Sequence, residues 1–157
     1  MARITVNTTG TQPILEISTD TANVANAALA VTCLQDITIT NSTGIYSYTD
    51  FCSTDMNKIT TPADNEVSTN MVLDGEVYFG NAGATANTAA FYGVAGISED
   101  KVNISWKLYM NGNANGAFYY TGTGYISSLA PTVSPDAPVW ISPMSIAVDG
   151  QMTSGIV

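Results

Sequence analysis

Two pairs of neighbouring carboxylates are the side chains in this sequence best suited to acid–base chemistry. They are Asp74 with Glu76, and Glu99 with Asp100. A site that cleaves glycosidic bonds needs two acids about 5–9.5 Å apart in a cleft, and same-face neighbours on a strand could meet that distance. In a chain with 13 acidic and 4 basic residues, however, solvated surface acids are far more common than catalytic pairs. We therefore interpret all four as acidic surface residues.

Other catalytic chemistries lack the residues they need. The chain has no histidine, which excludes Ser-His-Asp and Cys-His nucleophiles and imidazole metal sites. Ser127 and Ser128 have no base to activate them. Gly80 and Gly83 precede a possible helix, but neither the G-x-G-x-x-G pattern nor a Walker lysine is present. No acids have the close spacing of a calcium loop, so we expect no catalytic, cofactor-binding or metal-binding residues.

The charge of the chain restricts its partners. The net charge is −9 and the pI is near 4.1, with four scattered cations: Arg3, Lys58, Lys101 and Lys107. These are too few for stable binding to nucleic acid or for a polybasic membrane anchor. We find neither an 18-residue apolar stretch nor a secretory signal. Cys33 and Cys52 are therefore expected to stay reduced in a cytosol, as small core residues and not as a disulfide.

The composition indicates one β-rich domain over residues 1–157. A chain of this length typically has a single core. Apolar residues make up 45% of the sequence and charged residues only 11%, while 21 Thr, 13 Ser, 13 Asn and 13 Gly supply the polarity. β-Branched residues favour strands, and Asn and Gly favour turns.

Hydrophobic residues at a spacing near two predict four short strands before residue 40. These lie at residues 4–6, 14–17, 29–33 and 37–39. Residues 41–70 are mostly polar and have few apolar anchors, and a segment of that kind inside a compact domain usually orders with a partner or serves a function. We expect a long polar loop there.

The middle of the chain predicts a strand and then one short helix. MVLDGEVYF at 71–79 indicates a strand that bends at Gly75. The Ala-rich segment that follows favours one short amphipathic helix ended by Gly93 or Gly96.

Residues 101–129 predict a hairpin. KVNISWKLYM at 101–110 alternates apolar and polar residues, NGNANG at 111–116 suits a turn, and residues 117–129 return as the second strand. The residues expected to pack in this hairpin are Val102, Ile104, Trp106, Leu108, Met110, Phe118 and Tyr120. A proline-rich connector, a last strand at 139–148 and a short tail at 150–157 complete the chain. The fold class is all-β dominated: a β-sandwich with one short flanking α-helix.

From about Ser68 to Met152, the order of these features resembles the tail tube protein of long-tailed bacteriophages, the lambda-type major tail protein. The elements that carry the resemblance are MVLDGEVYF, the helix ending in AAFYGVAG, KVNISWKLYM, NGNANG, the return strand and WISPMSIAVDGQM. The return strand of that family typically carries a G-x-x-S-S/T-hydrophobic segment, and its closing strand ends in Gly. The matching residues here are Gly124, Ser127, Ser128, Leu129 and Gly150.

The resemblance implies a structural virion protein without enzymatic activity or cofactor. It implies hexameric rings stacked into a tube, with inner strands of six subunits closing into one β-barrel through which DNA leaves without stable binding. On this basis residues 41–70 are the stacking loop, and Asp74, Glu76, Glu99 and Asp100 are candidates for an acidic outer or lumen surface. The implied partners are tape-measure, tail terminator and distal tail proteins, with assembly in the bacterial host cytoplasm and no membrane.

Two other functions are compatible with the sequence. The aromatics of the 101–129 hairpin could form the sugar-binding platform of a carbohydrate-binding adhesin or fibre module. The chain could also be the tube subunit of a related contractile injection particle, which sequence alone does not separate from a phage tail.

Overall fold

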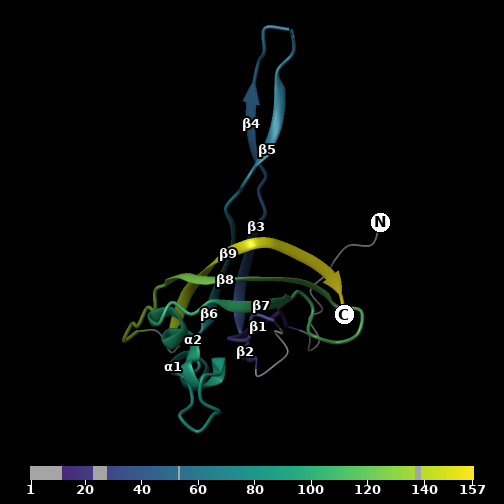
Figure 1. Ribbon diagram of the computed structural model, residues 1–157. Helices are drawn as coiled ribbons and strands as arrows, with labels where there is room; N and C mark the ends of the chain where they lie inside the picture. Colours follow the sequence, from purple (N-terminus) through teal and green to yellow (C-terminus); the bar gives the residue numbers. More distant parts are fainter. Residues whose placement is uncertain (1–11, 23–27, 53, 137–138) are drawn as a thin grey trace.

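The computed structural model describes residues 12–22, 28–52, 54–136 and 139–157, so the strand predicted at 4–6 lies outside the described residues. The described chain forms an antiparallel seven-stranded sheet with two helices at one end and a separate hairpin that projects from the opposite end (Figure 1). The strands are β1 (Ile14–Ser18), β2 (Leu29–Val31), β3 (Leu34–Thr40), β4 (Gly44–Tyr48), β5 (Asn57–Thr61), β6 (Asn65–Val72), β7 (Ile104–Tyr109), β8 (Phe118–Leu129) and β9 (Ile141–Ile156). The prediction of a β-dominated fold is confirmed.

The large sheet has the strand order β2-β1-β7-β8-β9-β6-β3. The long strands β8 and β9 connect its two halves. β8 pairs with β9 from Phe118 to Leu129, and its first half, up to Gly124, pairs with β7 as well. The register between β8 and β9 shifts between Thr121 and Thr123, opposite Gly150 of β9, whose φ of 82° suits a bulge. This bulge lets one hydrogen-bonded sheet change direction.

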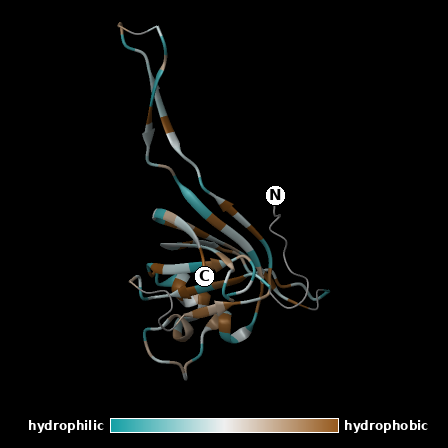
Figure 2. Cartoon of the chain, turned by 90° about the vertical axis from the view of Figure 1, so that its right-hand side faces the viewer, coloured by the Kyte–Doolittle hydropathy of each residue, from teal (hydrophilic) through white to brown (hydrophobic). Residues whose placement is uncertain are grey.

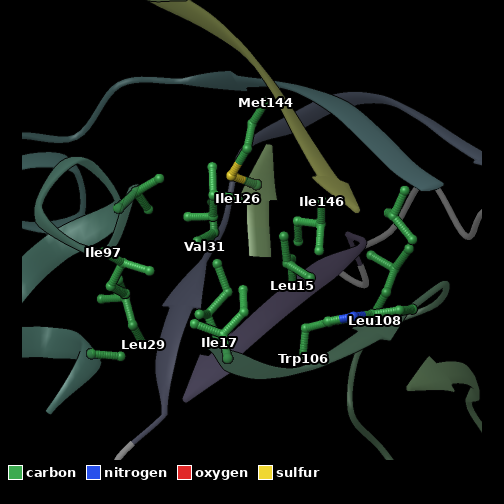
Figure 3. Close-up of a cluster of buried hydrophobic side chains, with 14 of the residues drawn as sticks. Leu15, Ile17, Leu29, Val31, Ile97, Trp106, Leu108, Ile126, Met144 and Ile146 are labelled. Carbon is green, nitrogen blue, oxygen red and sulfur yellow. The ribbon is translucent and has the colours of Figure 1, made fainter. Parts of the chain in front are cut away.

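Both halves of the sheet contribute to one core, which gives the sheet its sandwich-like character. Leu15 and Ile17 of β1 belong to the same buried cluster as Met144 and Ile146 of β9, although β7 and β8 lie between these strands in the sheet. Figure 3 shows these side chains directed toward a common interior that also contains Trp106. The sheet must therefore curve around the core.

Two helices, and not one, cover an end of this core. Helix α1 (Gly75–Phe79) occupies the second half of the segment predicted as a strand at 71–79, so that prediction is wrong beyond Val72. The physical reason is the side chain of Asp74, whose Oδ1 accepts hydrogen bonds from the amides of Glu76 at 3.0 Å and Val77 at 3.2 Å and so begins a helix.

Helix α2 (Ala89–Glu99) starts at the N-cap Thr88 and consists of two helical stretches that meet at a kink at Gly93. Gly93 has a φ of 66° and kinks the helix, but Val94 and Ile97 are fully buried beyond the kink. The first helical stretch thus ends at Gly93, one of the two glycines expected to end it, and the stretch after the kink is held to the core by these two side chains. Neither helix in the described part of the chain is long and apolar enough to cross a membrane.

The C-terminal prediction was also wrong in its boundary. Residues predicted as a tail at 150–157 form the second half of β9 up to Ile156, which pairs with Phe118 at the start of β8. The bulge at Gly150 is the reason, because its Asp-Gly sequence looks like the end of a strand while the pairing resumes beyond it.

The cysteines are free, but they are not core residues. Cys33 and Cys52 are both exposed. Cys33 lies just before β3 and has a φ of 60°, and Cys52 lies in the turn after β4.

Candidate assembly surfaces

The carboxylate pairs lie at the ends of helices. Asp74 and Glu76 cap and begin α1, while Glu99 and Asp100 end α2, and all four residues are exposed. Asp74 thus has a structural role as N-cap. Among the described residues no group of three or more Cys, Asp or Glu could hold a metal ion.

The predicted hairpin residues occupy different environments. Ile104, Trp106 and Leu108 are buried, and Val102, Met110 and Tyr120 pack against the core while remaining partly exposed. Phe118 is 41% exposed and lies at the start of β8, paired with Ile156 of β9. A sugar platform needs aromatic faces open to solvent. Because Trp106 is buried, it cannot be part of the sugar-binding platform expected for a carbohydrate-binding module.

The segment predicted as a polar loop at 41–70 has two distinct parts. Residues 65–70 belong to β6 inside the main sheet, whereas β4 and β5 form a two-stranded hairpin that projects from the body (Figure 1). We call residues 44–61 the arm. At its base the Ser42 amide donates a hydrogen bond to Asn65 Oδ1 at 2.9 Å, and Ser42 Oγ donates one to the Asp64 carbonyl at 3.0 Å.

The arm exposes large apolar side chains. Tyr46 pairs with Ile59 across the two strands, and Tyr48 stacks on Tyr46 with ring centroids 6.3 Å apart and planes 18° apart. Cross-strand pairs and alternate residues share a face, so these three side chains form one apolar face of the arm. Hydrophobic segments stand out on the projecting hairpin in Figure 2. Tyr46 is 58% exposed and Phe51 at the tip is fully exposed.

Such a hairpin needs a partner. An isolated two-stranded hairpin is marginally stable in water. Every residue of β4 and β5 except Gly44 and Asn57 is exposed. Exposed apolar side chains on a projecting element are typical of a surface that becomes buried on assembly.

A second surface is the outer face of strands β3, β6, β9 and β8. Its side chains point away from the core, because Ile39, Val67 and Ile146 on the same strands point into it. The strand registers place these residues on the outer face: Asp36, Thr38, Thr40, Glu66, Ser68, Asn70, Pro143, Ser145, Ala147, Tyr125 and Ser128. None is Lys or Arg, and we call this surface the cation-free face.

Hydroxyl groups run across the cation-free face in one row. Thr38 lies beside Ser68, Ser68 beside Ser145, and Ser145 beside Ser128. The acids Asp36 and Glu66 flank this row on β3 and β6. The face is therefore polar, small-chained and neutral to acidic.

A third surface is an apolar groove between the helices and the connector that leads to β9. It has a volume of about 430 Å³, and it is lined by Leu73, Tyr78, Phe79, Tyr92, Ala95, Gly96, Glu99, Pro131, Val133 and Trp140. We call it the helical groove. Phe79, Val133 and Trp140 are 67%, 56% and 46% exposed, so its walls are largely open.

Tyr78 forms the floor of this groove. Its ring packs edge-on against Phe79, with centroids 4.9 Å apart. Burial raises the pKa of the Tyr78 hydroxyl above its usual 10.0, and the nearby charge of Glu99 raises it further. The neutral phenol is thus the form the folded chain favours.

Comparison with solved structures identifies the architecture. The chain is similar to a chain in the tail of an empty gene transfer agent (GTA) particle with C6 symmetry, with a TM-score of 0.58 and 12% identity over 88% of this chain and 93% of that one. It is similar to a chain of the PVC sheath-tube complex, an extracellular contractile injection system. The TM-score is 0.57 and the sequence identity 11%, over 93% of this chain and 89% of that one. It is also similar to a chain of the SPP1 tail tube, with a TM-score of 0.54 and 15% identity over 93% of this chain and 77% of that one.

This chain has the tail-tube fold. No protein-family model matches the sequence, and no curated protein sequence matches it.

The residues predicted from the family pattern have clear positions in this tail-tube fold. A Cβ on Gly124 would collide with the carbonyl of Ala147 on β9, so a larger residue would separate β8 from β9. Ser127 Oγ donates a hydrogen bond to the Ser145 carbonyl at 3.2 Å, and Leu129 packs against the core. Ser128 is exposed on the cation-free face.

Sequence reasoning missed the apolar face of the arm. The alternation in GIYSY at 44–48 and in NKITT at 57–61 was the available signal, but each run has only five residues within a polar segment. The helical groove had no local signal, because its walls come from three separate parts of the chain.

Proposed function

We propose that this protein is a structural virion protein, the subunit of a tail tube that conducts DNA, and that it has no enzymatic activity. The observation that carries the proposal is the likeness to tail and tube structures over nearly the whole chain. By analogy with the C6-symmetric GTA tail, six copies form a ring and the rings stack.

In this proposal the cation-free face lines the lumen. A conduit for a polyanion must not trap phosphates, and stable DNA binding relies on Lys and Arg. Cross-strand hydroxyls such as those of Ser68 and Ser145 offer no fixed positive charge. The outer edge of β3, which no other strand of the described residues covers, is then available to pair with a neighbouring subunit, since ring closure leaves no exposed strand edge. Asp74, Glu76, Glu99 and Asp100 then lie at the helical end of the subunit and not on the lumen wall.

The arm makes the contact between rings. The stacking segment predicted at 41–70 narrows to residues 44–61, because β6 is part of the sheet. The tape-measure, tail terminator and distal tail proteins are the further partners, and the tube is assembled in the bacterial host cytoplasm.

The tube of a contractile injection particle is the second candidate. The similarity to the PVC sheath-tube complex, at a TM-score of 0.57, favours it about as much as the GTA match favours a DNA-conducting tail. A sheath gene beside this one, or a sheath co-purifying with the tubes, would select the contractile particle.

Size-exclusion chromatography over a concentration series, followed by negative-stain electron microscopy, tests the proposal. We expect rings or hollow tubes of uniform width. A chain that remains monomeric at high concentration and in the presence of its tail-initiation complex would contradict the proposal.

A further inference from the structure

The arm and the helical groove lie at opposite ends of the molecule. In Figure 1 the hairpin β4–β5 projects from one end, and α1 and α2 lie at the other; Figure 2 shows the same arrangement after a 90° turn. Both surfaces are apolar and open to solvent. Surfaces that lie at opposite ends of one chain can join identical copies head to tail without limit.

We propose that the arm of one copy docks in the helical groove of the next copy, with Tyr46 and Tyr48 against Val133 and Trp140. This inference rests on the proposed function and assigns the acceptor of the stacking contact. The partner is a second copy of this chain.

Shape and size agree with this pairing. The stacked rings of Tyr46 and Tyr48, with Ile59 beside them, form a narrow projecting ridge. The helical groove is a depression of about 430 Å³ between helices and connector, within the range of about 300–1,000 Å³ in which proteins enclose compact ligands. It can therefore accept one or two aromatic side chains. Clusters of aromatic residues supply much of the affinity in protein interfaces.

The charges of the arm do not contribute to this pairing. The arm carries Lys58 together with the acids Asp50 and Asp55, and Lys58 pairs with Ser47 on the face opposite Tyr46. The proposed contact is therefore an apolar one, with Glu99 at the border of the groove.

A small contact between arm and groove is enough to hold two rings together, because it occurs several times at each joint. One hairpin in one groove buries less than a stable protein interface of about 1,200–2,000 Å². In stacked six-membered rings the contact repeats six times at each joint, and linked contacts strengthen one another. The single arm–groove contact is then weak by itself and strong in the ring.

A mixing experiment tests the pairing. The arm variant Tyr46→Ser/Tyr48→Ser keeps an intact groove, and the groove variant Val133→Ser/Trp140→Ser keeps an intact arm. All four residues are exposed, so both variants should fold, which thermal unfolding checks. We expect each variant alone to weaken stacking by about tenfold or more. When the two variants are mixed in equal amounts, the intact arm of one can dock in the intact groove of the other, but the complex cannot extend further. The mixture should therefore form two-layer complexes, and stacks of three or more layers should be absent.

The variant Ile45→Ser is the matched control. Ile45 lies on the same arm and is 59% exposed, but it pairs with Thr60 on the opposite face. It should stack as the wild type does. Equal loss of stacking in this control would overturn the assignment of the tyrosine face.

A photo-crosslinking residue at position 46 of the wild-type background identifies the acceptor directly. Adducts within residues 131–140 or in α2 support the proposal. Adducts between two arms, or normal stacking by the groove variant, overturn it and leave the tube function intact. If the wild-type chain forms neither rings nor tubes, the proposed function fails, whereas crosslinks from position 46 of one chain to the helical groove of another would still support the head-to-tail contact.

Discussion

Individual residues determine how closely the elements of this fold can approach. Gly93 shows this most clearly, because it allows α2 to kink against the end of α1. Its φ is 66°, and a Cβ there would lie 2.6 Å from the Tyr78 carbonyl oxygen and collide with the amide of Gly80. A side chain at this position requires both a strained backbone and a displaced helix.

We therefore expect Gly93→Ala to lower the free energy of unfolding by about 2 kcal/mol or more. Gly75→Ala is the matched control, since nothing lies within 4 Å of the place that its methyl group would take and its φ is not positive. Its stability should be unchanged or higher by up to about 1 kcal/mol. Urea titrations of both variants measure the difference, and equal effects would refute the close-contact explanation.

Ionisation of Tyr78 should affect how the free energy of unfolding depends on pH. Its pKa is raised in the folded chain, so the folded state holds the phenolic proton more tightly than the unfolded state does. The resulting stabilisation is fully present below the usual value of 10.0 and is lost as pH rises through the higher folded pKa. Unfolding measured between about pH 8 and 11 should show a steeper alkaline decline for the wild type than for Tyr78→Phe. Parallel curves would show that Tyr78 does not contribute.

At the scale of elements, α1 illustrates what sequence patterns could and could not predict. The alternation in KVNISWKLYM identified β7, and NGNANG identified the turn to β8, because both signals are local. The switch from strand to helix after Val72 depends on a single carboxylate that caps two amides. The hydrophobic pattern of 71–79 is compatible with either structure, so only the cap decides.

Loss of this cap should be measurable. Asp74→Ala removes the acceptor of the Glu76 and Val77 amides and should lower the free energy of unfolding by about 1 kcal/mol. Asp74→Asn keeps an acceptor oxygen and should lose only a fraction of that amount. If both substitutions cost the same in thermal unfolding, charge and not capping would be the cause.

The arm should be required for the stacking of rings but not for the folding of the subunit. Replacement of residues 44–61 by a two-residue Asn-Gly turn removes no residue of the buried core. We expect the melting temperature to change little and rings to form without stacking. Tubes of normal length from the arm-less chain would contradict the stacking role.

At the scale of the whole molecule, the charge distribution fits passage of a polyanion. The wild-type protein should bind duplex DNA negligibly at physiological salt, because the cation-free face offers no Lys or Arg. Adding three lysines as Thr38→Lys, Ser68→Lys and Ser145→Lys should create salt-dependent binding in a gel-shift assay. Tight, salt-dependent binding by the wild type would exclude that face as a passive lumen wall.

The overall architecture of the molecule could be predicted from the sequence, but the curvature of its sheet and its groove could not. Composition predicted a β-rich chain, and the resemblance over residues 68–152 predicted its architecture. The curvature of the sheet was not predictable, because it depends on the pairing of residues far apart in the chain, with register shifts between β8 and β9 at Thr121/Thr123 and at Ile126/Ser128. The helical groove likewise depends on Tyr78, Val133 and Trp140 meeting in space, which no local pattern encodes.

Cryo-electron microscopy of the assembled protein tests the central claim most directly. We expect a hollow tube of stacked rings in which β3, β6, β9 and β8 of each subunit face the lumen. A non-tubular assembly, or a tube with the cation-free face on its outer surface, would contradict it.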